Sequence, residues 1–234
     1  VGKNAEPAEA ILDELQSYFE AYANHPRVNF ASSPLTPWRC SAETLKKTHQ
    51  LALSHGRFSH IHVSETEGEV DMTLEATGQR PVAWFKELGI LDEHCQIVHS
   101  VWVDEDEISL LADCRAPVIH CPVSNAVLGS GIAPVGKMLR EGVNLRLGTD
   151  GPASNDTQDC FENMKIALCF ARAVNQDAAL LTPRKALEMA ACSSGINVGD
   201  EADLAIVDTD SVWANPVHDL DSALVLCGRA SGVS

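Results

Sequence analysis

Short apolar runs alternate with amphipathic segments along most of this chain. Runs of four or five residues in which Val, Ile and Leu recur predict buried strands, and apolar residues spaced three and four apart predict helices. The expected strands are residues 28–31, 59–63, 96–99, 117–121 and 143–147, and the expected helices are 7–23, 41–55, 81–88, 105–112, 133–141, 161–173 and 183–192. Strands that alternate with helices predict a parallel α/β sheet or barrel.

The alternation stops after residue 192. Residues 202–208 follow a glycine turn and predict a single strand, and residues 220–227 form another strand-like run. We therefore expect two parts: a main α/β domain over residues 1–195, and a tail over residues 196–234 that belongs to a second, small layer.

Composition bounds the class of protein. The chain has 234 residues, of which 45% are hydrophobic and 21% charged, enough for one large core. A net charge of −16 repels phosphate backbones, so nucleic-acid binding is not expected. No apolar run approaches ~18 residues and no signal peptide is visible, so we expect no membrane span and a cytoplasmic location. The eight cysteines form no C-x-x-C pair, so a zinc knuckle is not expected. Their number leaves disulfides open, but their sparse spacing in an enzyme-sized chain favours buried free thiols in a reducing compartment.

Two histidines and two acids follow the ends of predicted strands. His62 and Glu65 lie at and beyond the end of 59–63, His99 ends 96–99, and Asp150 follows 143–147. In a parallel barrel, such residues line one mouth. Imidazoles and carboxylates are metal ligands, and a carboxylate near a metal-bound water can move its proton. Taken singly, each could equally be a packed core histidine, a solvated glutamate or a turn aspartate.

Further polar residues belong to the same predicted edge. His120 lies near the end of 117–121 much as His99 ends its own strand, so both imidazoles would point into one mouth. Ser154 and Asn155 follow Asp150 in a polar loop, where turn capping is their ordinary role.

Three motifs in this order resemble the amidohydrolase superfamily. They are His-Val-Ser-Glu-Thr at 62–66, the stretch 120–135 from His-Cys-Pro-Val-Ser-Asn to Ala-Pro-Val, and Leu-Gly-Thr-Asp-Gly-Pro-Ala-Ser-Asn at 147–155. The most similar branch holds the adenosine- and guanine-type deaminases and the triazine chlorohydrolases, and the resemblance covers about residues 25 to 208. It implies a (β/α)8 TIM-type barrel with a small β-sandwich, to which the tail returns.

The resemblance also implies roles for single residues. His62 and Asp150 would bind one divalent metal, zinc or else iron. Glu65 would shuttle protons, His99 would polarise the attacked carbon or orient water, and Asp150 would also act as general base. The residues expected around the substrate are Leu35, Trp38, Trp102, His120 and Ser154.

The chain departs from the family's pattern in three places. The family's first two metal ligands form an H-x-H pair on strand one, and no such pair precedes His60. We therefore expect a fragment, or upstream strands that the sequence does not represent, and a metal that is weakly held or absent if these residues are its only ligands. Leu35 and Trp102 stand where relatives often carry histidine, which argues against adenosine-type substrates.

The function expected from these motifs is metal-dependent hydrolytic deamination of a purine-, pterin- or triazine-like ring by an enzyme that is a homodimer. Two alternatives remain open. The same attack could release chloride or an alkylamine from a triazine-like ring, or the chain could be a metal-free inactive scaffold. The start at Val1 rather than Met indicates a processed, truncated or partly represented N-terminus.

Overall fold

A computed structural model describes residues 8–191, 195–200 and 202–233 of the chain. It divides into two compact units, each described here by itself. The first unit comprises residues 1–119 and 140–144, and the second comprises residues 120–139 and 145–234. Pro7, the first residue of the predicted helix 7–23, lies outside the described residues. So does Cys192, which is predicted to end the helix 183–192 and to be a buried thiol.

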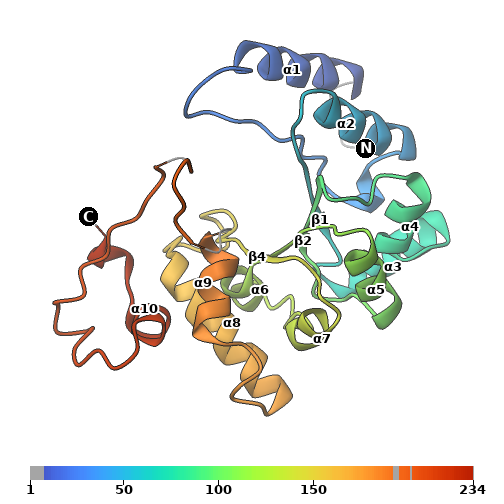
Figure 1. Ribbon diagram of the computed structural model, residues 1–234. Coiled ribbons are helices and arrows are strands. Elements are labelled where there is room, and N and C mark those ends of the chain that lie inside the picture. Colours follow the sequence, from blue (N-terminus) through green and yellow to red (C-terminus); the bar gives the residue numbers. More distant parts are fainter. Residues whose placement is uncertain (1–7, 192–194, 201, 234) are drawn as a thin grey trace. The chain divides into compact units, whose positions relative to one another are not determined.

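Three neighbouring parallel strands form the centre of the first unit. They are β1 (Ser59–Val63), β2 (Cys95–His99) and β3 (Val118–His120, of which residues to 119 belong here), and β1 and β2 run side by side in Figure 1. Ile61 lies opposite Ile97, and both side chains are buried. The parallel pairing of strands far apart in sequence confirms the predicted α/β organisation.

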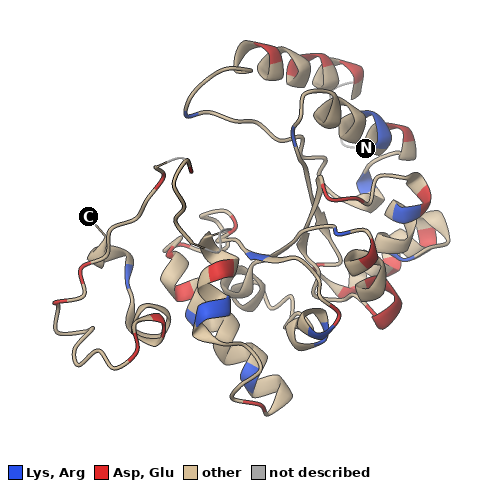
Figure 2. Cartoon of the chain, viewed as in Figure 1, with Lys and Arg blue, Asp and Glu red and all other residues tan. Residues whose placement is uncertain are grey.

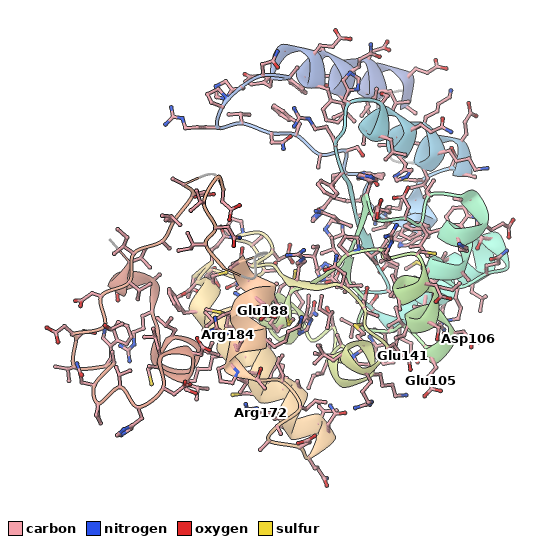
Figure 3. The ribbon with its side chains drawn as sticks, viewed as in Figure 1. Glu105, Asp106, Glu141, Arg172, Arg184 and Glu188 are labelled. Carbon is pink, nitrogen blue, oxygen red and sulfur yellow. The ribbon has the colours of Figure 1, made fainter. Side chains whose placement is uncertain are left out.

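Helices connect and cover these strands. They are α1 (Ala8–Ala21), α2 (Ala42–Ser54), α3 (Glu67–Thr77), α4 (Pro81–Leu88) and α5 (Glu105–Asp113), with a 3-10 turn η1 (Pro37–Arg39). Acidic residues are spread over α1 and over the first turn of α5 (Figure 2), where Glu105 and Asp106 are labelled in Figure 3. Of these five helices, α3 is the one that the sequence did not predict, because its buried face consists of Glu69, Val70 and Thr73 rather than an apolar stripe.

The strand expected at residues 28–31 is wrong. The chain instead forms a single parallel bridge between Ser32 and Ser59. The Phe30 ring stacks on Tyr18 of α1, with ring centroids 5.3 Å apart and planes 6° apart. A run this short gains little from one ladder partner, and its aromatic side chain packs on the helix instead.

The second unit is mainly helical. Its elements are α6 (Pro122–Val127), α7 (Val135–Arg140, of which residues to 139 belong here), β4 (Leu145–Leu147), α8 (Cys160–Asn175), α9 (Pro183–Ala191), α10 (Leu220–Cys227) and η2 (Ala230–Gly232). Helices α8 and α9 lie side by side (Figure 1) and pack against β4. Arg184 of α9, labelled in Figure 3, pairs with Asp221 of α10 at 3.0 Å.

The tail differs from its prediction. Residues 220–227 form the helix α10 and not a strand; Asp219 caps it by accepting a hydrogen bond from Ser222 N at 2.8 Å. An apolar run of eight residues fits either structure, and here packing against α8 and α9 favours the helix. At 202–208, the expected strand is reduced to one antiparallel bridge between Val207 and Val233.

Among the described residues, no helix combines the length and apolar character that crossing a membrane requires. The seven described cysteines carry free thiols, but the expectation that they are buried is wrong for most of them. Cys95 and Cys121 are buried, whereas Cys160, Cys169 and Cys227 are exposed on α8 and α10.

Candidate functional site

The carboxyl ends of β1 and β2 are held in an unusual backbone conformation. Ser64, His99 and Ser100 all have positive φ angles, of 54°, 74° and 51°. Such angles cost free energy in residues other than glycine and persist only where neighbours enforce them. Hydrogen bonds do so here: Ser64 O accepts from Val101 N at 3.0 Å and from Trp102 N at 2.9 Å, and Ser100 N donates to Val63 O at 3.1 Å. The two strand ends therefore form one fixed platform.

His62, Glu65 and His99 lie together on this platform. The rings of His62 and His99 are stacked, with centroids 5.4 Å apart and planes 21° apart. Oε2 of Glu65 lies 3.8 Å from Nε2 of His99. The His99 side chain is 1% exposed and that of Glu65 is 24% exposed, so of these two groups the carboxylate is the one that reaches solvent.

The hydrogen bond of His62 fixes its tautomer. Nδ1 lies 2.9 Å from the carbonyl oxygen of Leu35. Because a carbonyl only accepts, Nδ1 must carry the hydrogen, and in the neutral ring the lone pair is then on Nε2. Histidines that bind metals commonly donate their second N–H to a carbonyl in this way. His62 therefore has the chemistry of a metal ligand.

Both predicted tryptophans lie in the first unit, but only Trp102 is bonded to the platform. Trp102 is 40% exposed, and its backbone is fixed by the bond to Ser64 O and by Arg80 Nη2, which donates to Trp102 O at 2.6 Å. Trp38 belongs to η1, which packs against α3, and the Arg39 guanidinium lies 4.4 Å above its ring. Leu35 is 51% exposed, so it joins the group through its backbone.

Asp150, in the second unit, has a carboxylate held by three donors. Oδ2 accepts from Ser124 Oγ at 2.6 Å and from Ser154 Oγ at 2.9 Å, and Oδ1 accepts from Gly151 N at 2.8 Å. Hydrogen bonds to an ionised acceptor are about twice as strong as neutral ones. The carboxylate is therefore fixed in direction, at a residue whose φ is 62°.

The loop around Asp150 has its own supports. Asn155 Nδ2 donates to Thr149 O at 2.8 Å, which is the ordinary turn-capping role expected of it, and Gln158 Nε2 donates to Asp150 O at 2.6 Å. His120 is buried, and its carbonyl accepts from Gly148 N at 3.0 Å, two residues before Asp150.

The predicted residues thus form two groups, one in each unit. Leu35, His62, Glu65 and His99 are linked by direct contacts in the first, with Trp102 attached through the backbone. Asp150 and Ser154 are linked in the second, where His120 joins their loop. Convergence of the two groups in one mouth stays a prediction. Within the described residues, no group of three or more His, Cys, Asp or Glu side chains is arranged to hold a metal ion.

The sequence did not single out Glu69 or Ser124 for a functional role. Glu69 is 5% exposed, and its Oε2 accepts from Glu65 N at 2.8 Å. Burial, aided by the charge of Glu65, raises the pKa of Glu69, against the lowering effect of that hydrogen bond and of His62. Its sequence signature is Thr66 followed three residues later by Glu69, a capping pattern at a helix start.

A second histidine network resembles a catalytic triad but lies at the opposite end of β1. His49 Nδ1 is 2.8 Å from Ser59 Oγ, and His49 Nε2 is 3.1 Å from Asp92 Oδ2. Both His49 and Ser59 are 3% exposed, and burial raises the pKa of the neighbouring Cys95 to about 12. A serine enclosed in this way satisfies buried polar groups and stabilises the fold.

Comparison with known proteins gives a consistent result. The sequence profile of the amidohydrolase family matches residues 2–229. A 5-methylthioadenosine/S-adenosylhomocysteine deaminase of Thermodesulfovibrio yellowstonii is 35% identical over 97% of this chain and 54% of its own length. A 5'-deoxyadenosine deaminase of Methanopyrus kandleri is 34% identical over 100% of this chain and 56% of its own length. The chain therefore spans about half the length of these relatives.

Solved structures agree with the sequence relatives. A zinc-bound adenosine deaminase of Xanthomonas campestris has a TM-score of 0.93 and 30% identity, over 98% of this chain and 55% of its own. A zinc-bound atrazine chlorohydrolase of Arthrobacter aurescens has a TM-score of 0.90 and 23% identity, over 98% and 54%, and shows likeness of fold alone. These neighbours indicate a TIM-barrel-like α/β fold, which confirms the coarser part of the fold prediction.

Proposed function

Because the chain belongs to the amidohydrolase family, we propose that it contributes to metal-dependent hydrolytic deamination of an aminated nitrogen heterocycle. The observation that carries this proposal is the group on the β1–β2 platform. In this group, the hydrogen bond to the Leu35 carbonyl places the ring hydrogen of His62 on Nδ1, so Nε2 carries the lone pair. The Glu65 carboxylate lies 3.8 Å from the buried ring of His99. Relatives that deaminate adenosine-type compounds support it.

His62 and Asp150 are the residues that would hold a divalent metal. The donor chemistry of both fits, since His62 donates its second N–H to a carbonyl and Asp150 is oriented by three donors. Two ligands do not complete a zinc site, so these two residues by themselves would hold the ion weakly. Zinc in the Xanthomonas deaminase favours that metal, with iron as the alternative. A bound ion of this kind lowers the pKa of water to about 7.

Glu65 is the proposed proton carrier of the reaction. Its side chain is 24% exposed, so the carboxylate can meet the substrate and water. Glu65 would take a proton from the attacking water and deliver it to a nitrogen of the ring, which makes the amine a better leaving group. His99, stacked on His62, would orient the water or polarise the attacked carbon.

Asp150 is the proposed general base, and the substrate side chains complete the site. The hydroxyls of Ser124 and Ser154, which donate to Oδ2, orient the Asp150 carboxylate. Leu35, Trp38 and Trp102 would contact the substrate from the first unit, with His120 and Ser154 from the second. The exposed Leu35 and Trp102 side chains favour a flat, weakly polar ring, of purine, pterin or triazine type.

We further propose the arrangement of the whole protein. Residues 1–195 belong to the hydrolase barrel, residues 196–234 return to a small β-sandwich, and the protein is a homodimer in the cytoplasm. Light scattering on the purified full-length protein would establish the dimer, and a mass of one chain would exclude it.

The function is tested by an ammonia-release screen with zinc-loaded full-length protein over purines, purine nucleosides, pterins and aminotriazines, with Asp150→Asn as the inactive control. Ammonia released by the wild type alone supports deamination. Release of chloride or alkylamine from triazines, without ammonia, would establish the alternative hydrolase. Metal uptake without turnover of any ring would indicate an inactive scaffold.

A further inference from the structure

Two helices of the first unit start with the same sequence pattern but use it differently. In α5, Asp104 Oδ1 accepts from Glu107 N at 2.9 Å, and Glu107 Oε2 accepts from Asp104 N at 3.3 Å. This is a closed capping box. In α3, Thr66 Oγ1 accepts from Glu69 N at 3.2 Å, but Glu69 Oε2 reaches one residue further back, to Glu65 N at 2.8 Å. Capping of α3 therefore does not account for the position of Glu69.

The bond from Glu69 completes the fixation of one peptide group. That group joins Ser64 to Glu65. Its oxygen accepts from Val101 N and Trp102 N, and its N–H donates to Glu69. A peptide held at both its oxygen and its nitrogen cannot rotate about its flanking bonds, although Ser64 is in the left-handed region with φ of 54°. The direction in which the Glu65 side chain leaves the backbone is fixed in this way.

Burial of the Glu69 carboxylate is unfavourable if the residue has only a structural role. It is 5% exposed, and its second oxygen, Oε1, has no hydrogen-bond partner within the part of the chain that the structure describes. A buried acceptor without a partner loses its hydrogen bonds to water and gains none in return, which destabilises the fold. An apolar residue of the same size would avoid this cost but would leave the Glu65 amide unbound.

We propose that Glu69 is a positioning residue, which holds the backbone of Glu65 so that its carboxylate faces Nε2 of His99. The inference rests on the proposed function, in which Glu65 carries the proton. In this assignment Glu69 touches no reacting atom, because the group that it binds is the backbone N–H of Glu65. A displacement of about 1 Å at a reacting group can cost ~10²-fold in rate.

The test compares Glu69→Met and Glu69→Gln in zinc-loaded full-length protein. Methionine removes the acceptor, so kcat should fall on the order of 10- to 100-fold with little change in KM or metal content. Glutamine keeps an oxygen that can accept from Glu65 N and should restore kcat to within a few-fold. Ser41→Ala, which removes the cap of α2, is the control for lost stability and should leave kcat unchanged.

Two further measurements separate positioning from stability. In a Glu65→Gln background, Glu69→Met should lower kcat no further, because the group that it positions is already disabled. Amide hydrogen exchange at residue 65 should speed up in Glu69→Met and not in Glu69→Gln. Full kcat in Glu69→Met, or an unreduced loss in the Glu65→Gln background, would overturn the inference. A wild type that turns over no substrate while keeping a protected Glu65 amide would instead remove the proposed function, and the positioning role with it.

Discussion

Nδ1 of His62 lies 2.9 Å from the carbonyl oxygen of Leu35, a residue 27 positions earlier in the chain. The side chain of Leu35 is half exposed, so the residue acts on His62 through its backbone. The departure from histidine at position 35 therefore leaves the contact that orients His62, the proposed metal ligand, in place, although it changes the surface that a substrate would meet.

Leu35→Ala should change KM and leave metal binding intact, because the carbonyl that fixes the His62 tautomer is kept. His62→Ala should lower metal affinity by more than the ~10–100-fold that loss of an outer partner costs. Metal titration of both variants, together with KM, checks the prediction. Loss of metal from Leu35→Ala would show that the side chain, rather than the carbonyl, supports His62.

Glu65→Gln and Asp150→Asn should differ in their effect on the metal. Glu65→Gln should lose ~10²–10⁴-fold in kcat and keep its metal, because Glu65 is assigned to proton transfer alone. Asp150→Asn should lose activity and part of its metal, since a neutral amide is a poor base and a poor ligand. Metal stoichiometry and ammonia release are measured on the same samples. Near-native turnover in Glu65→Gln would refute the proton-carrier role.

Ser124→Ala should weaken both the second unit and the reaction. Its hydroxyl is buried and donates to Asp150 Oδ2 at 2.6 Å, and a bond to a charged group contributes about 1.5–3 kcal/mol. Urea unfolding should show a loss in this range, and kcat should fall while metal is retained. The exposed hydroxyl of Ser109, which donates to Glu105 O, provides the control: Ser109→Ala should cost under ~0.5 kcal/mol. Equal losses in the two variants would contradict the prediction.

Glu107→Gln should flatten the pH dependence of stability. Burial raises the pKa of Glu107 above the ordinary glutamate value of 4.5, against its hydrogen bonds and the charge of Arg80. The folded state then binds this proton more tightly than the unfolded state. The stability contributed by Glu107 is fully present below about pH 4.5 and is lost as the pH rises through the raised pKa. The free energy of unfolding of the wild type minus that of the variant should therefore decrease from pH 4 upward. A difference in the free energy of unfolding that stays constant with pH would contradict this prediction.

Local sequence determined the elements that carry their own start and stop. Residues 59–63 form β1 as predicted, and α4 begins at Pro81 and ends before Gly89, whose φ of 73° suits glycine. The positions of the strand ends also allowed His62, Glu65 and His99 to be predicted as neighbours, because adjacent parallel strands place their last residues at one edge of the sheet. The strands predicted at residues 220–227 and 28–31 are wrong, because a short apolar run is compatible with more than one structure until its packing is known.

Only the tertiary structure decided what surrounds these residues. The Leu35 carbonyl, the Glu69 carboxylate and the Ser124 hydroxyl each bind a candidate site residue. Leu35 and Ser124 lie 27 and 26 positions from their partners, a separation that no local pattern encodes. Glu69 is four positions from Glu65, but its pattern predicts an ordinary helix cap, and the left-handed turn at Ser64 is what brings the Glu65 amide to it. Residue type and spacing therefore determined which groups could react, and the folded backbone decided how each is held.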